Sequence, residues 1–148
     1  MNRRPIIKAL GTGVAALVGS SLHVNRTPSE KRIKKIKPQR LRKGDLVTLV
    51  APGGPVNDKK IDLAVKNISE MGFKIKHAKN LRAQRGHMAG TDKQRLEDLH
   101  TAFSDTETKA VWCVRGGDGC NRLLPHLDYK LIKRNAKALI GFSDITAL

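Results

Sequence analysis

The chain has 148 residues, of which 39% are hydrophobic and 3% aromatic. This length allows one ordinary domain with an aliphatic core and excludes two. The formal net charge of +16 favours polyanions or a membrane surface as partners. However, residues 1–43 contain twelve Lys and Arg against a single acid, Glu30, and therefore carry +11 of that charge. The globular remainder is only weakly basic, which argues against a general polyanion-binding protein.

The cysteines and histidines argue against a disulfide-stabilised protein and against a metal-binding protein. Cys113 and Cys120 are the only cysteines, so a disulfide framework is excluded. The histidines, His23, His77, His87, His100 and His126, are scattered without metal-ligand spacing. We therefore predict neither a metal site nor a cofactor.

Residues 1–22 have the order of an export signal. The segment MNRRPIIKALGTGVAALVGSS begins with basic residues, continues with an apolar run from Ala9 to Gly19 and ends with small polar residues. Its piece RRPIIK resembles a twin-arginine signal. The sequence thus predicts an exported, periplasmic protein, with a cytoplasmic protein as the alternative.

Residues 23–43 are predicted to form an extended basic linker. The stretch RTPSEKRIKKIKPQRLRK is rich in Lys and Arg and contains two prolines. A nucleic-acid-binding patch is the alternative, but no aromatic residue lies between these charges to stack on bases. We therefore expect no nucleic-acid partner.

The first half of the globular part alternates strand and helix patterns. Residues 45–51 form a near-continuous apolar run, typical of a strand covered on both faces. Residues 58–72 predict a helix that is capped by Gly72, and residues 73–78 alternate apolar and basic side chains like an edge strand. The expected buried stripe of the helix comprises Ile61, Ala64, Val65, Ile68 and Met71.

The second half repeats this alternation. Residues 79–90 are polar and predict a loop. A helix follows, with Thr91 and Gln94 as its capping box. Its expected buried stripe comprises Leu96, Leu99 and Phe103. The remaining predicted elements are a strand at 109–114, short helical pieces at 121–137 broken by Pro125, and a last strand at 138–142.

The alternation of strands and helices predicts an α/β fold. We expect a mostly parallel sheet flanked by helices on both faces, similar to a Rossmann fold, with right-handed crossovers. In such folds functional residues gather where the strands end at their carboxyl edge. Three features are predicted to lie there: residues 52–55 (the PGGP loop), residues 115–119 (the RGGDG loop) and Ser143.

Both glycine loops have two interpretations. The PGGP loop is either a tight turn or a place where a ligand reaches backbone amides, and it matches no nucleotide-binding motif. Glycines in the RGGDG loop allow amides to face an oxyanion. In that loop Arg115 either binds a substrate carboxylate or pairs with a nearby acid.

The two cysteines near this loop are interpreted as structural. Cys113 is predicted to be a small buried hydrophobic residue. Cys120 reads as a structural thiol rather than a nucleophile, because no basic partner lies beside it in the sequence.

The segment LIGFSDITAL also has two interpretations. A strand, a serine and the start of a helix form the arrangement of a nucleophile elbow, and Gly141 relieves crowding at the turn. The G-x-S-x-G pattern is incomplete because Ile145 occupies the last glycine position. From spacing alone, Ser143 or Asp144 is better explained as a helix N-cap.

Several motifs together resemble one family. LRKGDLVTLVAPGGPV, GTDKQRLEDLH, VWCVRGGDGCNRLLPHLDY and LIGFSDITAL occur in this order. In order and spacing they resemble the LD-carboxypeptidase family, which includes microcin C immunity-type peptidases. The resemblance runs from about Leu41 to Leu148. It implies a serine peptidase with a Ser–Glu–His triad that releases D-alanine from murein tetrapeptides in peptidoglycan recycling.

The resemblance also implies site roles. Ser143 matches the nucleophile, and the amides of Gly117 and Asp144 match the oxyanion hole. Arg115 and Gly116 are the expected substrate-binding residues. A murein peptide or a related small peptide is the expected partner, and a homodimer of the full-length protein is a further expectation.

The sequence departs from the family pattern at the catalytic partners. The family's Glu and His lie in a second domain, and none of the histidines in this sequence occupies a matching position. We therefore expect residues 44–148 to be an N-terminal α/β domain that is truncated at its C-terminal end and inactive by itself. A non-catalytic module that binds muropeptides or anions is the alternative.

Overall fold

The computed structural model describes residues 35–148. The predicted export signal and most of the predicted linker lie outside the described residues. Residues 35–43, the described end of that linker, contain no helix or strand. Within the described part, no helix has the length and apolar character needed to cross a membrane.

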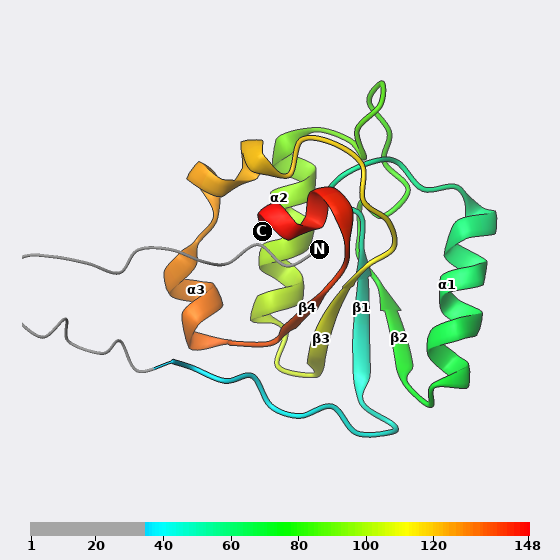
Figure 1. The fold of residues 1–148 in the computed structure, drawn as a ribbon, viewed down its shortest axis with the longest axis vertical. Helices are drawn as coiled ribbons and strands as arrows, with labels where there is room; N and C mark the ends of the chain where they lie inside the picture. The colour runs from blue at the N-terminus through cyan, green and yellow to red at the C-terminus, as the bar shows by residue number, and fades with distance from the viewer. Residues whose placement is uncertain (1–34) are drawn as a thin grey trace, which may run out of the picture. The chain divides into compact units, whose positions relative to one another are not determined.

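Four parallel strands form the sheet at the centre of the fold (Figure 1). Their spatial order is β2-β1-β3-β4, so β2 and β4 are the edge strands. The prediction of a parallel α/β sheet is confirmed, including the edge position of the strand rich in basic residues. The strands are β1 (Leu46–Val50), β2 (Lys74–His77), β3 (Thr108–Cys113) and β4 (Ala138–Ile140).

Helices connect the strands, and local sequence explains where the longer ones begin. The Asn57 side chain accepts a hydrogen bond from the Lys60 amide at the start of α1. Thr91 and Gln94 form the predicted capping box of α2. The helices are α1 (Asp58–Glu70), α2 (Asp92–Ser104), α3 (Tyr129–Arg134) and two 3₁₀ helices, η1 (Asn121–His126) and η2 (Ser143–Ala147).

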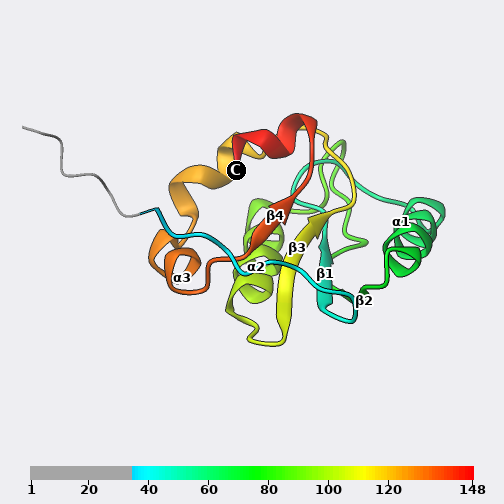
Figure 2. The same ribbon diagram turned by 60° about the horizontal axis from the view of Figure 1, so that its bottom comes forward.

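Apolar side chains cover both faces of the sheet, as expected for buried parallel strands. Leu49 of β1 packs in a core cluster that includes Ile61 and Ile68 of α1. Its neighbour Val50 packs in a second cluster, with Leu99 of α2. Figure 2 shows α1 at one side of the sheet and α2 with α3 at the other. Adjacent residues of β1 therefore belong to two separate cores.

Two details differ from the sequence-based expectations. Met71 is 43% exposed rather than buried, because α1 ends at Glu70 and Gly72 reverses the chain with a φ of 87°. Pro125 lies inside η1 instead of breaking the helical segment. The break falls instead at Leu127, after which Asp128 caps α3.

The strand order brings the two glycine loops together. The chain leaves β1 toward one edge strand, β2, and leaves β3 toward the other, β4. Such a reversal opens a crevice at the carboxyl ends of the two central strands. The PGGP loop follows β1 and the RGGDG loop follows β3, so the topology places both at this point.

Candidate active site

Ser143 lies at a sharp turn directly after β4. It has a φ of 59°, and within residues 35–148 it is the only non-glycine residue with a positive φ. Serine seldom adopts this conformation, which occurs where surrounding structure enforces it. The N-cap interpretation is wrong: Phe142 occupies the N-cap of η2, and no side chain makes the capping hydrogen bond. The exposed hydroxyl is thus presented at a strand-to-helix turn, the geometry of a nucleophile elbow.

Gly141 and Ile145 shape this turn. A Cβ atom placed on Gly141 would lie 2.5 Å from Cγ2 of Ile145, so glycine is required there. Ile145 is 4% exposed and packs in the core beside α2. The isoleucine that interrupts the G-x-S-x-G pattern therefore anchors the turn, while the predicted role of Gly141 in relieving crowding is confirmed.

The RGGDG loop lies against Ser143. A Cβ atom on Gly116 would lie 2.9 Å from Cβ and 3.2 Å from Oγ of the serine, so only a glycine backbone can approach so closely. Gly116 is buried, whereas Gly117 is exposed and has a φ of 146°. The exposed part of the loop is thus held next to the serine.

The amides of Gly117 and Asp144 form no hydrogen bond within the described part of the chain. Gly117 belongs to the loop that contacts the serine, and Asp144 follows the serine directly. Unpaired N–H groups on two sides of a nucleophile are the donors that an oxyanion hole requires. The fold brings both predicted donors to the neighbourhood of Ser143.

The Asp144 carboxylate ties the elbow to the RGGDG loop. Its Oδ2 atom accepts a hydrogen bond of 3.0 Å from the amide of Cys120. Burial, and then the nearby Asp144 carboxylate, raise the pKa of the Cys120 thiol far above its ordinary value. Burial also raises the pKa of Cys113 to about 12. Both cysteines are buried thiols, as predicted, and the geometry offers no thiolate nucleophile.

The PGGP loop supports its neighbour through backbone contacts. The Gly54 amide donates a hydrogen bond of 3.0 Å to the carbonyl of Gly116, and the Ala89 amide donates one of 2.9 Å to the carbonyl of Gly53. A Cβ atom on Gly117 would lie 2.0 Å from the Gly54 nitrogen. Of the two interpretations of this loop, the geometry favours the structural turn.

Arg95 joins both loops, and sequence reasoning missed it. The residue is 1% exposed. Its Nη1 atom donates to the carbonyl of Pro52 at 2.6 Å and to that of Gly119 at 3.3 Å. Its Nη2 atom pairs with Asp92, which also accepts hydrogen bonds from Arg122. Its spacing from Leu99 could have predicted its burial. Arg95 precedes Leu99 by four residues and therefore lies on the same buried face of the helix.

Arg115 bonds to a backbone carbonyl and not to an acid of the described residues. Its Nη1 atom donates a hydrogen bond of 3.1 Å to the carbonyl of Pro55, and the side chain is half-buried. It forms no ion pair with an acid of the described residues. Its remaining N–H groups stay available beside the PGGP loop.

None of the described histidines forms a hydrogen bond with Ser143. His100 accepts a hydrogen bond from the amide of Asp128, and His87 lies 3.4 Å from the carboxylate of Asp118. No side chain within residues 35–148 forms a hydrogen bond with the hydroxyl of Ser143. The same residues contain no group of three or more His, Cys, Asp or Glu side chains able to hold a metal ion.

Two proteins similar in sequence to this chain are named murein peptide carboxypeptidases. The chain is 45% identical over 112 residues to a probable murein peptide carboxypeptidase of Bacillus subtilis, covering 76% of this chain and 35% of that protein. It is 40% identical over 103 residues to the murein tetrapeptide carboxypeptidase of Pseudomonas aeruginosa, covering 69% and 34%. The chain therefore spans about a third of the length of these relatives.

Solved structures agree with the sequence relatives. An MccF-like protein of Bacillus anthracis superposes with a TM-score of 0.70 at 36% identity, covering 74% of this chain and 34% of that chain. A muramoyltetrapeptide carboxypeptidase of Oxalobacter formigenes superposes with a TM-score of 0.60 at 26% identity, covering 68% and 34%. Residues 47–148 match the family model of the LD-carboxypeptidase N-terminal domain, and the chain belongs to the LD-carboxypeptidase family.

Proposed function

We propose that this chain is the N-terminal part of a serine-type LD-carboxypeptidase. Its reaction would hydrolyse the L,D-peptide bond to the terminal D-alanine of murein tetrapeptides during peptidoglycan recycling. The names of the relatives from Bacillus subtilis and Pseudomonas aeruginosa support the substrate class. The observation that carries the serine mechanism is the positive φ of Ser143 at a strand-to-helix turn, against a glycine loop.

Ser143 is the nucleophile of this mechanism. Its Oγ attacks the carbonyl carbon of the scissile bond, and the amides of Gly117 and Asp144 donate hydrogen bonds to the resulting oxyanion. Collapse breaks the C–N bond and leaves an ester on Ser143, while the proton that the hydroxyl loses is transferred to the nitrogen of the departing D-alanine. Water then hydrolyses the ester and restores the hydroxyl.

Arg115 and Gly116 are the proposed substrate-binding residues. Arg115 uses one N–H group on the carbonyl of Pro55, which leaves further donors for the carboxylate of a peptide. Gly116 contacts the serine through its backbone, so a substrate held there would lie close to the nucleophile. This arrangement suits an enzyme that recognises a free peptide carboxylate.

A polypeptide of these 148 residues is proposed to be inactive by itself. A serine hydroxyl needs a general base within hydrogen-bond reach to become an effective nucleophile. No side chain among residues 35–148 forms a hydrogen bond with the hydroxyl of Ser143, and the Thr146 hydroxyl bonds only to its backbone carbonyl. This same observation favours a second candidate function, a module that binds muropeptides or anions at its free amides without chemistry.

The experiment measures D-alanine release from L-Ala-γ-D-Glu-meso-diaminopimelyl-D-Ala. We expect no release by the 148-residue chain. We expect release by a fusion in which residues 44–148 replace the matching third of the Bacillus subtilis relative. In the fusion, Ser143→Ala should lower the rate by about a thousandfold or more, whereas Ser69→Ala on the exposed face of α1 should leave it unchanged.

Three outcomes test these proposals. Equal rates in the fusion with and without Ser143→Ala would contradict the serine mechanism. A fusion that binds the tetrapeptide but releases no D-alanine would favour the binding module. Release of D-alanine by the 148-residue chain, abolished by Ser143→Ala, would overturn the proposed inactivity.

A further inference from the structure

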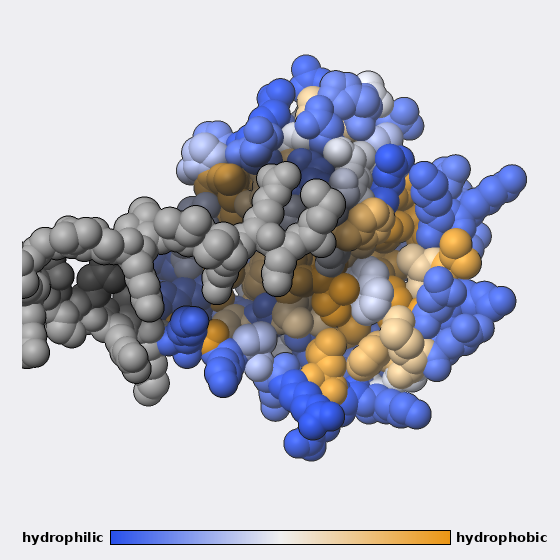
Figure 3. Space-filling model, viewed as in Figure 1, coloured by the Kyte–Doolittle hydropathy of each residue, from blue (hydrophilic) through white to orange (hydrophobic). Residues whose placement is uncertain are grey.

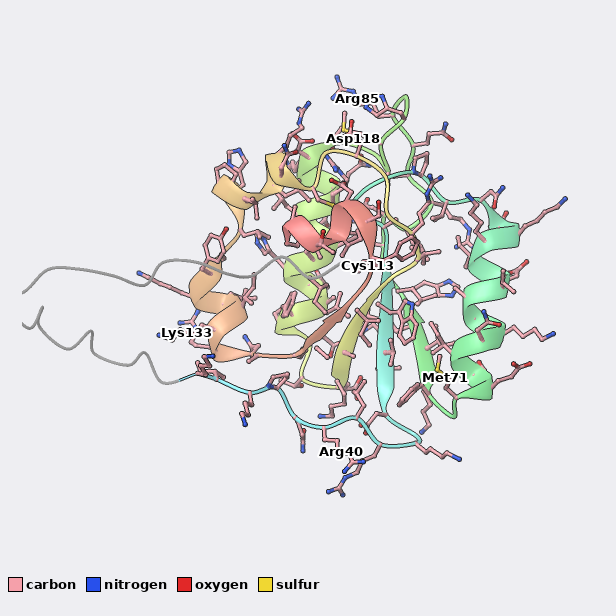
Figure 4. The ribbon with its side chains drawn as sticks, in the orientation of Figure 1. Arg40, Met71, Arg85, Cys113, Asp118 and Lys133 are labelled. Atoms are coloured by element: carbon pink, nitrogen blue, oxygen red, sulfur yellow. The ribbon has the colours of Figure 1, made fainter. Side chains whose placement is uncertain are left out.

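A cavity lies beside the RGGDG loop. It has a volume of about 520 Å³ and is bounded by the 85–88 turn, the first turn of α2 and the start of η1. The top of Figure 3 is hydrophilic, and Figure 4, drawn in the same orientation, labels Arg85 and Asp118 at that end of the molecule. None of the residues assigned to the serine mechanism lines it.

The side chains around this cavity are mainly basic. Arg85, Lys93 and Arg122 line it, together with His87. The single acid in the lining, Asp92, is already engaged by Arg95 and Arg122, and the hydrogen bond from Arg95 holds its pKa below the ordinary value. A second carboxylate, that of Asp118, lies 3.4 Å from His87. Three Arg and Lys side chains therefore face two carboxylates, and the cavity has a net positive charge.

Arg85 and Lys93 are among the cations of residues 35–148 that have no acidic partner. Lys76, Lys79 and Arg82 each form a salt bridge with an acid at 2.9 Å or less. Within residues 35–148, Arg85 and Lys93 form no salt bridge and donate no side-chain hydrogen bond. Their charged groups line the cavity and remain free to bind an anion.

The cavity lies within a short peptide's reach of Ser143. Gly116 contacts the serine at one end of the RGGDG loop, and a Cβ atom on Gly119, at the other end, would lie 3.0 Å from the sulfur of Met88 in the cavity wall. Three residues of extended chain span at most about 11 Å. An extended peptide of four residues covers about 13 Å, so one ligand can occupy both places.

We propose that this cavity binds the carboxylate groups of an acidic peptide whose scissile end lies at Ser143. The inference rests on the proposed function. It assigns a binding site to the internal carboxylates of the substrate, which the residues around Ser143 do not bind. A murein tetrapeptide carries carboxylates on its D-glutamyl and diaminopimelyl residues in addition to its terminal one. Arginine and lysine bind carboxylates through charge-assisted hydrogen bonds.

The test titrates the Ser143→Ala form of the full chain with the tetrapeptide and follows backbone amide signals by nuclear magnetic resonance. Removing the hydroxyl prevents turnover without touching the cavity. We expect signals of Arg85 and Lys93 to shift. The double variant Arg85→Glu, Lys93→Glu should weaken binding by about tenfold or more. The control Lys66→Glu, Lys74→Glu makes the same charge change at exposed positions of α1 and β2 and should retain the affinity.

The outcomes distinguish this inference from the proposed function. Shifts at Gly117 and Asp144 without shifts around the cavity would overturn the inference and leave the proposed function standing. Shifts at the cavity alone would support the inference and count against the serine site. Equal weakening by the two double variants would also overturn it, because net charge alone would then explain binding.

A modified ligand gives a second test. A tetrapeptide with both internal carboxyls amidated should bind about tenfold more weakly or worse, and equal affinity would contradict the proposal.

Discussion

The PGGP and RGGDG loops have similar compositions but use their backbones differently. Both follow central strands at the carboxyl edge of the sheet. The PGGP loop is largely buried, and its Gly54 amide bonds to its neighbour. The RGGDG loop exposes Gly117, whose amide has no partner within the described residues. Glycine serves close backbone packing in the first loop and the presentation of a free donor in the second.

The largest effect is expected where the two loops touch. Gly117→Ala would place a methyl group 2.0 Å from the Gly54 nitrogen at a backbone φ of 146°. We expect the free energy of unfolding to fall by about 3–5 kcal/mol, since both strain and overpacking are introduced. Urea denaturation followed by circular dichroism measures this loss.

Gly86→Ala is the matched control. Gly86 also has a positive φ, of 60°, but a Cβ atom there meets no atom within 4 Å. Its cost should be about 1 kcal/mol, the backbone term alone. Equal losses in the two variants would mean that contact between the loops contributes nothing.

Arg95→Met should have the next largest effect, because it removes the buried guanidinium that bonds to both loops. We expect the free energy of unfolding to fall by about 2–3 kcal/mol. Amide hydrogen exchange at Gly54 should also accelerate more than exchange in β1. A uniform acceleration would show that the arginine stabilises the whole fold and not the loops.

Arg122→Met provides the comparison for that variant. Arg122 bonds to the same aspartate, Asp92, but its side chain is 58% exposed. Exposed ion pairs contribute little, so the loss should stay below about 1 kcal/mol. A loss as large as that of Arg95→Met would contradict the importance of the buried bonds to the loop carbonyls.

A smaller change in the free energy of unfolding is expected when acid protonates Asp92. Hydrogen bonds from Arg95 and then Arg122 lower the pKa of Asp92 below its ordinary value of 3.8. A carboxyl with a lowered pKa in the folded state stabilises that state above pH 3.8, and this contribution is lost as the pH falls below it. The unfolding free energy of Asp92→Asn should therefore depend less on pH below 3.8, which acid titration of urea denaturation checks.

The smallest effect, almost no reaction with an alkylating reagent, is expected at the two cysteines. Burial raises the pKa of Cys113 to about 12 and places that of Cys120 far above its ordinary value. Iodoacetamide at pH 8 should therefore alkylate neither thiol in the folded chain. Rapid alkylation of Cys120 at pH 8 would revive a thiol nucleophile next to the RGGDG loop.

Sequence patterns predicted the fold well because the decisive signals are local. The capping box of Thr91 and Gln94 and the apolar run of β1 each report on a few neighbouring residues. Met71 was misplaced because the apolar periodicity continues one residue beyond Glu70, the last residue of α1. Such errors at element ends leave the topology unchanged.

Site geometry was harder to predict because it depends on contacts distant in sequence. Arg95 bonds to Pro52, 43 positions away, and a charged residue on a helix is ordinarily expected in solvent. The spacing around Ser143 favoured an N-cap, and only the positive φ distinguishes an elbow from a cap. The candidate nucleophile and both oxyanion donors came from the family resemblance and not from spacing.

The central claim is that Ser143 is the nucleophile beside the RGGDG loop. The most direct test treats the fusion with the Bacillus subtilis relative with a phosphonate analogue of the tetrapeptide and locates the adduct by mass spectrometry. We predict a single covalent adduct on Ser143, formed in parallel with the loss of D-alanine release. Inhibition with an adduct on another residue, or full D-alanine release from a Ser143→Ala fusion, would contradict the account.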